Sequence, residues 1–312
     1  MRGYQRVALV GTGHIGGSLL LALRGCGRVA RAVGFDRDRA AAERAREIGI
    51  VDEITESIEE AVGGAELIVL AVPVRATGEV ALAFAQVAPE ERAAACLIID
   101  VGSTKGRVVA EVEEALSQGA GVSGVSRKLR FVGCHPMAGT ERSGPDAADA
   151  KLFVGRRVIV TPTENTGAEA VKEAEELWRA VGAEVLLMDA GLHDRVVGAV
   201  SHLPHAAAFS LAAATGRLVG GDVELAKWAG RIAGTSFADT TRVAASDPAM
   251  WRDILLDNRE AVLAGTALLV EELSALRAAV ERGDGAAILA LIERARRAKR
   301  GIAEGGSRGG AK

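Results

Sequence analysis

Cysteine is scarce in this chain, and its few cysteines suit neither a disulfide framework nor a zinc site. The 312 residues include 3 cysteines, Cys26, Cys96 and Cys134. They are odd in number, lie far apart and form no CxxC pair. This usage fits a reducing compartment, so we expect a cytoplasmic protein with free thiols.

Long apolar runs and an excess of one charge are also missing. No apolar run approaches the roughly eighteen residues of a membrane span. The first residues lack the pattern of a secretory leader, so we expect no membrane partner. The formal net charge of -3 gives no basic surface for nucleic acid. With 49% hydrophobic residues the chain can bury a full core, and a small molecule is the expected partner.

Short β-branched runs alternate with helical stretches through the first part of the chain. The apolar runs are RVALVG, AVGFD, ELIVLAVP, CLIIDVGS, RFVGCHP, RRVIVTP and AEVLLMD. Near-continuous apolar runs are typical of strands covered on both faces. They predict an α/β fold with a Rossmann-like, doubly wound parallel sheet, and residues 1–188 are the expected dinucleotide-binding domain.

The strand rhythm stops after MDAGLHD, and apolar residues then recur at helical spacings. This predicts an all-helical domain over 189–304, in which Asp247 and Pro248 begin one helix. Stripes such as AVLAGTALLVEELSALRAAV favour a homodimer, and an intrachain bundle explains them equally well. The polar, glycine-rich end predicts a disordered tail over 305–312.

The stretch VALVGTGHIGGSL places Gly11, Gly13 and Gly16 in GxGxxG spacing between a strand and a helix. Gly11 permits a tight turn, Gly13 lets the backbone approach a pyrophosphate, and Gly16 lets the helix lie close to the strand. The other loop residues expected to border the phosphates are Thr12, His14 and Ile15, with the ring of His14 exposed.

The second strand, AVGFD, ends in Asp36, where a carboxylate would hold the adenosine ribose hydroxyls. This acid would repel a 2′-phosphate and therefore favours NAD. Arg37 and Arg39 follow at once and would tolerate NADP. The glycine spacing and the acid together predict NAD as the cofactor, with NADP as the weaker alternative.

In a doubly wound sheet the ligand lies outside the carboxyl ends of the strands. Pro73, Ser103 and His135 stand just past three predicted strands. A hydroxyl and an imidazole at two such ends can meet over a nicotinamide, and an alcohol oxidation requires a base there as hydride leaves. Cys134 points to the other face of its strand, so we expect a buried thiol and no nucleophile.

The helical part holds a second cluster of polar side chains. His202 and His205 in SHLPH share a helical face if the helix persists through Pro204. No acidic third ligand accompanies them, so we expect no metal. Arg242 is a planar donor suited to bidentate capture of a carboxylate, and a surface pair with Asp239 is the alternative.

Taken in order, five blocks resemble prephenate dehydrogenase of tyrosine biosynthesis: GTGHIGGSL, DVGSTKG, HPMAGTERSG, SHLPH and FADTTRVAASDPAMWRDI. The resemblance implies conversion of prephenate and NAD to 4-hydroxyphenylpyruvate, carbon dioxide and NADH. It implies that His135 accepts a hydrogen bond from the ring hydroxyl and assists its deprotonation. By the same resemblance Ser103 orients His135 and that hydroxyl, and Arg242 binds a substrate carboxylate.

The resemblance implies further roles at the same site. His205 would line the substrate pocket, and Ser201 would lie near the nicotinamide. Thr140 and Glu141, after His135, resemble gate or pocket residues. Trp251 would reach the site of a partner subunit.

Related activities compete with this interpretation. Arogenate dehydrogenase and a dual-specificity cyclohexadienyl dehydrogenase would need an acid for the substrate ammonium, for which Glu141 and Asp239 are candidates. A β-hydroxyacid dehydrogenase would use a lysine, and SHLPH holds none. A cofactor-sensing regulator would have no use for Ser103, His135 and Arg242 together.

Overall fold

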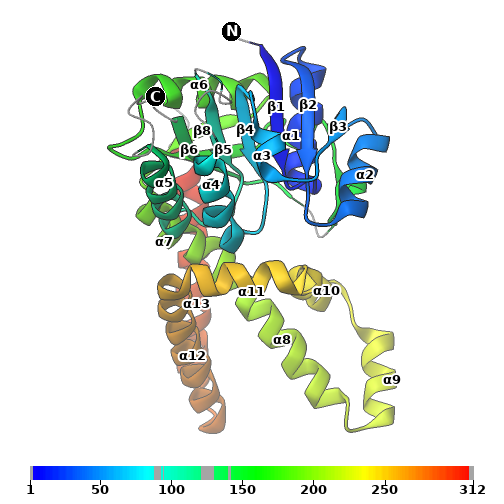
Figure 1. Cartoon of the computed structure of the whole chain (residues 1–312). Coiled ribbons are helices and arrows are strands. Elements are labelled where there is room, and N and C mark those ends of the chain that lie inside the picture. The colour runs from blue at the N-terminus through cyan, green and yellow to red at the C-terminus, as the bar shows by residue number, and fades with distance from the viewer. Residues whose placement is uncertain (1–2, 88–92, 94, 121–129, 140–141, 309–312) are drawn as a thin grey trace. The chain divides into compact units, whose positions relative to one another are not determined.

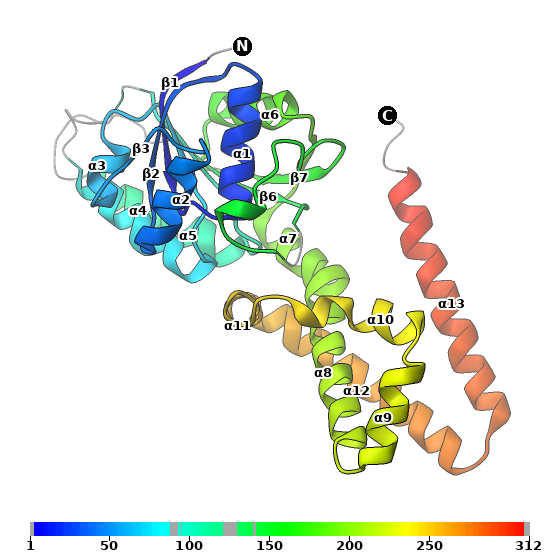
Figure 2. The same ribbon diagram turned by 90° about the vertical axis from the view of Figure 1, so that its right-hand side faces the viewer.

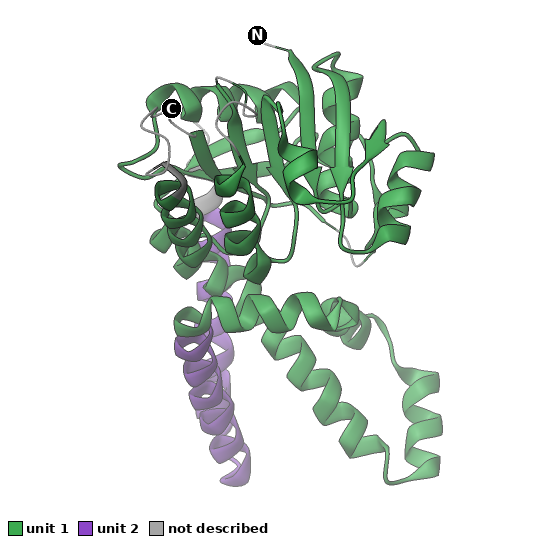
Figure 3. Ribbon diagram, viewed as in Figure 1, with its two compact units in different colours: residues 1–261 green, residues 262–312 purple. Residues whose placement is uncertain are grey.

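The computed structural model describes residues 3–87, 93, 95–120, 130–139 and 142–308. Two compact units make up the chain, residues 1–261 and 262–312 (Figure 3). The helices between residues 190 and 261 belong to the same unit as the sheet, so these units do not divide the chain after residue 188. The candidate site lies entirely in the first unit.

An eight-stranded sheet forms the centre of the first unit, in the order β3-β2-β1-β4-β5-β6-β7-β8 (Figure 1). Its strands are β1 (Tyr4–Val10), β2 (Val29–Phe35), β3 (Glu53–Ile54), β4 (Leu67–Leu70), β5 (Leu97–Asp100), β6 (Arg130–Pro136), β7 (Arg157–Thr161) and β8 (Glu184–Leu187). All neighbouring strands are parallel except β6 and β7. The predicted doubly wound α/β fold is confirmed.

The direction of β7 differs from the all-parallel prediction. A parallel return requires a crossover of a dozen or more residues, usually a helix. In the described residues, the connection from β6 to β7 contains only the short 3₁₀ turn η3 (Pro145–Ala147), and β7 returns antiparallel to β6. Apolar runs reveal that a strand is buried and carry no signal of its direction.

Helices cover both faces of the sheet (Figure 2). One face packs on α1 (His14–Gly25), α2 (Arg39–Glu47) and α6 (Ala168–Ala180), and the other on α3 (Ile58–Val62), α4 (Thr77–Gln86) and α5 (Gly106–Ala120). Alternate side chains of β1 enter the two cores: Val7 and Leu9 join one, while Ala8 and Val10 join the other. This alternation follows from the pleat and explains why the central strands are apolar throughout.

A long helix follows the sheet, and it contains an irregular turn. The helices α7 (Ala190–Val197) and α8 (Leu203–Val219) are joined by the π-helical turn η4 (Gly198–His202). Pro204 lies in the first turn of α8, where its missing N–H is tolerated, so the helix persists through it.

The remaining helices of the first unit are short. They are α9 (Val223–Ile232), α10 (Thr235–Thr241), the 3₁₀ turn η5 (Arg242–Ala245) and α11 (Pro248–Asp257), followed by the start of α12 (Arg259–Glu281). Asp247 caps α11 as predicted, since its carboxylate accepts the Met250 N–H at 2.7 Å.

The continuous helix Ala190–Val219, of 30 residues, is long and apolar enough to cross a membrane by length and composition. The prediction concerned an uninterrupted apolar run, and polar residues such as Asp194, Arg195 and His202 interrupt this helix, which becomes long because the π turn joins two helices into one. A helix in a protein core passes the same test, so the observation is weak evidence for a span.

The second unit contains the remainder of α12 and α13 (Gly285–Arg308). Arg294 of α13 pairs with Glu272 of α12 at 2.6 Å. Residues 305–308, assigned to a disordered tail from the sequence, are helical instead.

Candidate active site

The glycine loop after β1 has the close packing that the sequence predicts. Gly11 has a φ of 91°, and a Cβ there would lie 2.4 Å from the Ala71 carbonyl oxygen. A Cβ on Gly16 would lie 2.6 Å from the Ala71 Cβ, so α1 needs glycine to approach the sheet. A Cβ on Gly13 would meet nothing within 4 Å, because its backbone borders an open cavity.

Asp36 lies directly past β2, as predicted, and it also fastens the glycine loop. Its Oδ2 accepts hydrogen bonds from the Thr12 N–H at 2.7 Å and the Thr12 hydroxyl at 3.0 Å. Arg39 is occupied by ion pairs with Glu43 and Glu56. A 2′-phosphate would therefore meet the carboxylate of Asp36 and an already paired Arg39, with the exposed Arg37 as the remaining cation, and the acid favours NAD.

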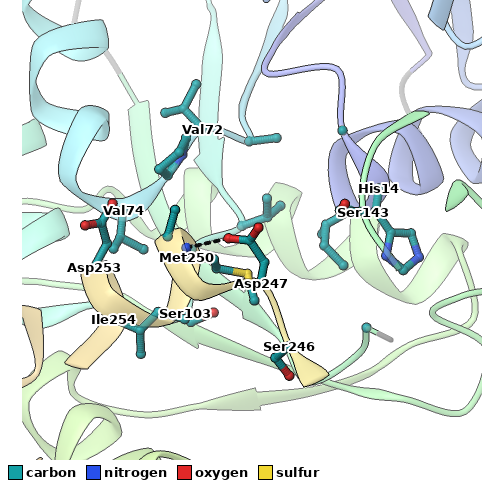
Figure 4. Close-up of a pocket in the computed structure, with 18 of the residues that line it drawn as sticks. His14, Val72, Val74, Ser103, Ser143, Ser246, Asp247, Met250, Asp253 and Ile254 are labelled. Atoms are coloured by element: carbon teal, nitrogen blue, oxygen red, sulfur yellow. Dashed lines mark hydrogen bonds between the residues drawn. The ribbon is translucent and has the colours of Figure 1, made fainter. Parts of the chain in front are cut away.

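A cavity of about 440 Å³ opens beside this loop (Figure 4). The predicted residues that line it are Gly13, His14, Ile15, Pro73 and Ser103. Side chains from α11 and the segment before it close another side: Ser246, Asp247, Ala249, Met250, Asp253 and Ile254. The open Gly13 backbone at the start of α1 fits a dinucleotide whose phosphates face a helix N-terminus.

His14 differs from its prediction. Its ring is buried, with 9% of the residue exposed, although it lines the cavity beside Ser143 (Figure 4). Burial lowers the pKa of His14, and the nearby charge of Arg142 acts in the same direction. The ring is therefore neutral near pH 7.

His135 stands at the end of β6, and β5 holds that end in place. The carboxylate of Asp100 accepts the Cys134 N–H at 2.9 Å and pairs with the buried Lys105 ammonium. Burial, followed by the charges of His193 and Lys105, holds the pKa of His135 well below its ordinary value. His135 is therefore a neutral imidazole, able to accept a proton.

The side-chain partner of His135 is His193 rather than Ser103. The His135 Nδ1 and the His193 Nε2 lie 2.8 Å apart. Sequence reasoning missed His193 and the adjacent Asp194. The only sequence signal was a histidine and an acid side by side in MDAGLHD, just after the last strand.

Cys134 is buried in the core, as predicted. Burial and the charge of Asp100 raise the pKa of its thiol to about 12. A thiolate is thus disfavoured, which argues against a nucleophilic role.

Ser201, His205, Trp251 and Arg242 gather around the π turn and α11. The His205 ring stacks on Trp251 with centroids 3.6 Å apart, and its Nδ1–H donates to the Ser201 carbonyl oxygen at 2.8 Å. Burial lowers the pKa of His205, and the charge of Arg242 adds to this effect. None of the four lines the cavity, which lies next to them at Ser246.

Two residues of this cluster have environments that bear on their predicted roles. Trp251 is 7% exposed and stacks on His205 of its own chain, and its reach toward a partner's site stays a prediction. Arg242 is exposed and, among the described residues, pairs with no carboxylate, including that of Asp239. Its guanidinium is available to an external anion.

His202 packs edge to face on the same Trp251 ring on which His205 stacks, with centroids 5.9 Å apart, but it lies deeper in the protein. It is 1% exposed, and its Nδ1 lies 3.0 Å from the Asn258 side-chain nitrogen. Burial lowers the pKa of His202 to about 4. Within the described residues, no group of three or more His, Cys, Asp or Glu side chains could hold a metal ion. Thr140 and Glu141 lie outside the described residues.

We expect Gly11→Ala and Gly13→Ala to have opposite effects. Gly11→Ala should lower the free energy of unfolding by about 2 kcal/mol or more, because the Cβ overlaps backbone at a positive φ. Gly13→Ala should leave stability nearly unchanged and weaken cofactor binding, since its Cβ enters the cavity. Thermal unfolding and NAD titration of both variants test this. Equal stability loss in the two would contradict it.

Comparison with known proteins places these features in a family. The family model described as "Prephenate dehydrogenase, nucleotide-binding domain" matches residues 19–187, and "Prephenate dehydrogenase, dimerization domain" matches residues 189–294. A cyclohexadienyl dehydrogenase of Zymomonas mobilis is 34% identical over 297 residues, which are 95% of this chain and 95% of that protein.

Further relatives agree with the family models. A prephenate dehydrogenase of Bacillus subtilis is 34% identical over 278 residues, 89% of this chain and 71% of that protein. The crystal structure of prephenate dehydrogenase from A. aeolicus in complex with hydroxyphenyl propionate and NAD+ has a TM-score of 0.81 and 34% identity, covering 96% of this chain and 98% of that chain. Since the family models and the relatives extend over most of the sequence, this chain belongs to the prephenate dehydrogenase family of NAD-dependent oxidoreductases.

Proposed function

We propose that this chain catalyses the NAD-dependent oxidative decarboxylation of prephenate to 4-hydroxyphenylpyruvate in tyrosine biosynthesis. The observation that carries the proposal is a neutral, buried imidazole at the end of β6. His135 itself does not line the cavity, but it lies three residues before Ala138, which lines the cavity together with Gly13 and Ser103. An alcohol oxidation requires a proton acceptor close to the cofactor, and His135 and the dinucleotide site would supply these two parts.

Each residue at the site would have a defined task. His135 accepts the hydroxyl proton while hydride leaves the same carbon, and Ser103 orients the hydroxyl. Arg242 binds a carboxylate of the substrate dianion. His205 and Trp251 form an aromatic wall next to Arg242, and Ser201 holds the His205 ring.

NAD would lie against the glycine loop and supply the hydride acceptor when bound. The cofactor-binding residues would be Gly11, Thr12, Gly13, His14, Ile15, Gly16, Asp36, Pro73 and Ser201. Thr140 and Glu141 would close the substrate pocket. Aromatisation and loss of carbon dioxide drive the reaction, so alignment, a proton acceptor and a cationic clamp suffice.

A direct assay tests the proposal. Purified protein is mixed with prephenate or arogenate and with NAD or NADP, and the absorbance of reduced cofactor is followed. We expect turnover with prephenate and NAD, and no turnover with either substrate would refute the enzyme assignment.

Asp36→Asn should shift the cofactor preference. The amide keeps one oxygen for Thr12 but removes the negative charge, so the ratio of kcat/KM for NAD over NADP should fall by about tenfold. Asp38→Asn is the matched control, because Asp38 caps α2 next to the same strand end. An unchanged ratio in Asp36→Asn would show that Asp36 does not select the cofactor.

Cyclohexadienyl dehydrogenase, acting on both prephenate and arogenate, is the second candidate. The similarity to the Zymomonas mobilis protein over 95% of both chains favours it specifically. Comparable kcat/KM for the two substrates would support this dual activity, and a strong preference for arogenate would indicate arogenate dehydrogenase.

We also propose a homodimer formed through the helical domain, residues 189–304. Large apolar side chains are exposed on its helices in the single chain, including Leu218, Val223, Ile232, Leu268 and Leu289. A second copy covering these faces would remove that apolar surface from water. With free cysteines throughout, the cytoplasm is the expected compartment.

A further inference from the structure

A chain of hydrogen-bonded side chains leads away from His135 into the protein. The His135 Nδ1 lies 2.8 Å from the His193 Nε2, with the two rings edge to face at 69°. The His193 Nδ1 lies 2.8 Å from the Asp194 Oδ1. His193 is completely buried, so water does not compete for these bonds.

The start of α5 fixes the far end of this chain. The Asp194 Oδ1 accepts the Lys105 N–H at 2.8 Å, and its Oδ2 accepts the Gly106 N–H at 2.7 Å. Burial opposes ionisation of Asp194, yet the hydrogen bonds from His193, Lys105 and Gly106 outweigh it and lower the pKa of Asp194. Asp194 is therefore a fixed carboxylate near pH 7.

We propose that Asp194 and His193 are positioning residues that hold His135 as the tautomer with its proton on Nδ1 and a free lone pair on Nε2. A carboxylate only accepts hydrogen bonds, so the bond to Asp194 comes from the Nδ1–H of His193. With its proton on Nδ1, the His193 ring accepts at Nε2, and the proton between the rings belongs to Nδ1 of His135. The free Nε2 is the form that a proton acceptor needs.

The inference rests on the proposed function, in which His135 receives the substrate proton. The hydroxyl O–H bond breaks, the proton binds Nε2 of His135, and hydride leaves the same carbon for the cofactor. As the bond to carbon dioxide breaks, its electron pair aromatises the ring, and the proton returns from Nε2 to the phenol oxygen. While His135 is protonated, its Nδ1–H stays on His193, and Asp194 offsets the charge.

Several titratable groups surround this chain of side chains. His135 comes from β6, Lys105 from the segment before α5, and His202 from the π turn. Lys105 is neutralised by Asp100, with both side chains buried, and Asp194 is the carboxylate in contact with His193. The tautomer of His135 therefore depends chiefly on His193 and Asp194.

Nitrogen-15 NMR of the full-length protein tests the tautomer directly, because imidazole nitrogens with and without a proton differ widely in chemical shift. The chain has only 5 histidines, and the signals missing from His135→Asn identify His135. We expect protonated Nδ1 and unprotonated Nε2 on His135 at neutral pH. A proton on Nε2 in the native protein would overturn the proposal, whatever the behaviour of the variants.

Two substitutions of His193 separate positioning from packing. In His193→Gln the amide oxygen takes the place of Nε2 and still accepts from His135, so we expect the tautomer to persist and most of kcat to remain. In His193→Leu the acceptor is gone, so we expect a mixed tautomer and a fall in kcat by about 10- to 100-fold, with KM little changed.

Results that overturn the positioning role of His193 differ from results that refute the proposed enzymatic activity. A kcat for His193→Leu within twofold of the native value, or no advantage of His193→Gln over His193→Leu, would overturn the proposal. If His193→Leu does not fold, as judged by thermal unfolding and NAD binding, the His135 tautomer measured in the native protein decides whether the proposal holds. Absence of turnover by the native protein would refute the proposed activity, while the tautomer measurement would stand by itself.

Discussion

His135→Asn is expected to lower kcat by about 1000-fold while leaving KM within a few-fold of the native value. The asparagine side chain places an amide near the former Nδ1 and can still donate to the His193 Nε2. It provides nothing at the position of the His135 Nε2. The variant thus removes the proton acceptor and retains the hydrogen bond that His193 makes in the native protein.

The loss should fall on kcat because the proton moves only in the transition state. An interaction made in the transition state and absent from the ground state changes kcat and leaves KM nearly constant. His135 is buried, and its hydrogen bond to His193 uses Nδ1, so Nε2 is the nitrogen left to accept the proton.

The measurement is steady-state kinetics with prephenate and NAD, accompanied by thermal unfolding. Cys134→Ala is the matched control, because it alters the neighbouring side chain on the opposite face of β6. Its backbone N–H keeps the bond to Asp100. If kcat of His135→Asn stays within tenfold of the native value, His135 is not the proton acceptor.

Arg242→Gln is expected to raise KM for prephenate by about 10- to 100-fold, with kcat reduced much less. The guanidinium is exposed and unpaired by any described carboxylate, so its planar donors are free to hold a substrate carboxylate in two parallel hydrogen bonds. Glutamine can donate one such bond and carries no charge. Because this contact exists in both ground and transition states, its loss weakens binding.

Arg217→Gln is the matched control for charge, since Arg217 is an exposed arginine of α8. It should leave KM unchanged. A second measurement uses the neighbouring imidazole: the charge of Arg242 contributes to the low pKa of His205, so that pKa should rise in Arg242→Gln. If kcat falls while KM is constant, Arg242 acts on the reaction step and not on binding.

The nucleotide loop was predictable because its requirements are local. The positive φ of Gly11 belongs to the turn from β1 into α1. Gly11 and Gly16 also approach Ala71, which follows β4, but the GxGxxG spacing itself indicates that close packing. The position of His135 at a strand end also follows from a short apolar run. Parallel topology brings such ends to one edge, so the general location of the site follows from the sequence.

The pairing of His135 with His193 was not predictable in this way. The two residues are 58 positions apart, and their contact depends on how the first helix after the sheet packs on β6 and α5. The same applies to Asp194, whose acceptors are filled by backbone N–H groups of a distant segment. Neither the direction of β7 nor the π turn has a signature in hydrophobic spacing, because both are set by tertiary packing.

The π turn Gly198–His202 determines which side of α8 is presented to the site. A π turn contains about one residue more than an α-helical turn, and one residue corresponds to about 100° of rotation around the helix axis. Deleting a single residue here would let α7 continue as a regular α-helix into α8. His205 would then be rotated away from Trp251 by roughly a quarter of a turn, although every residue of α8 would keep its identity and its helical conformation. The rotation of His205 toward Trp251 therefore depends on the number of residues in the π turn and not on the chemistry of any one of them.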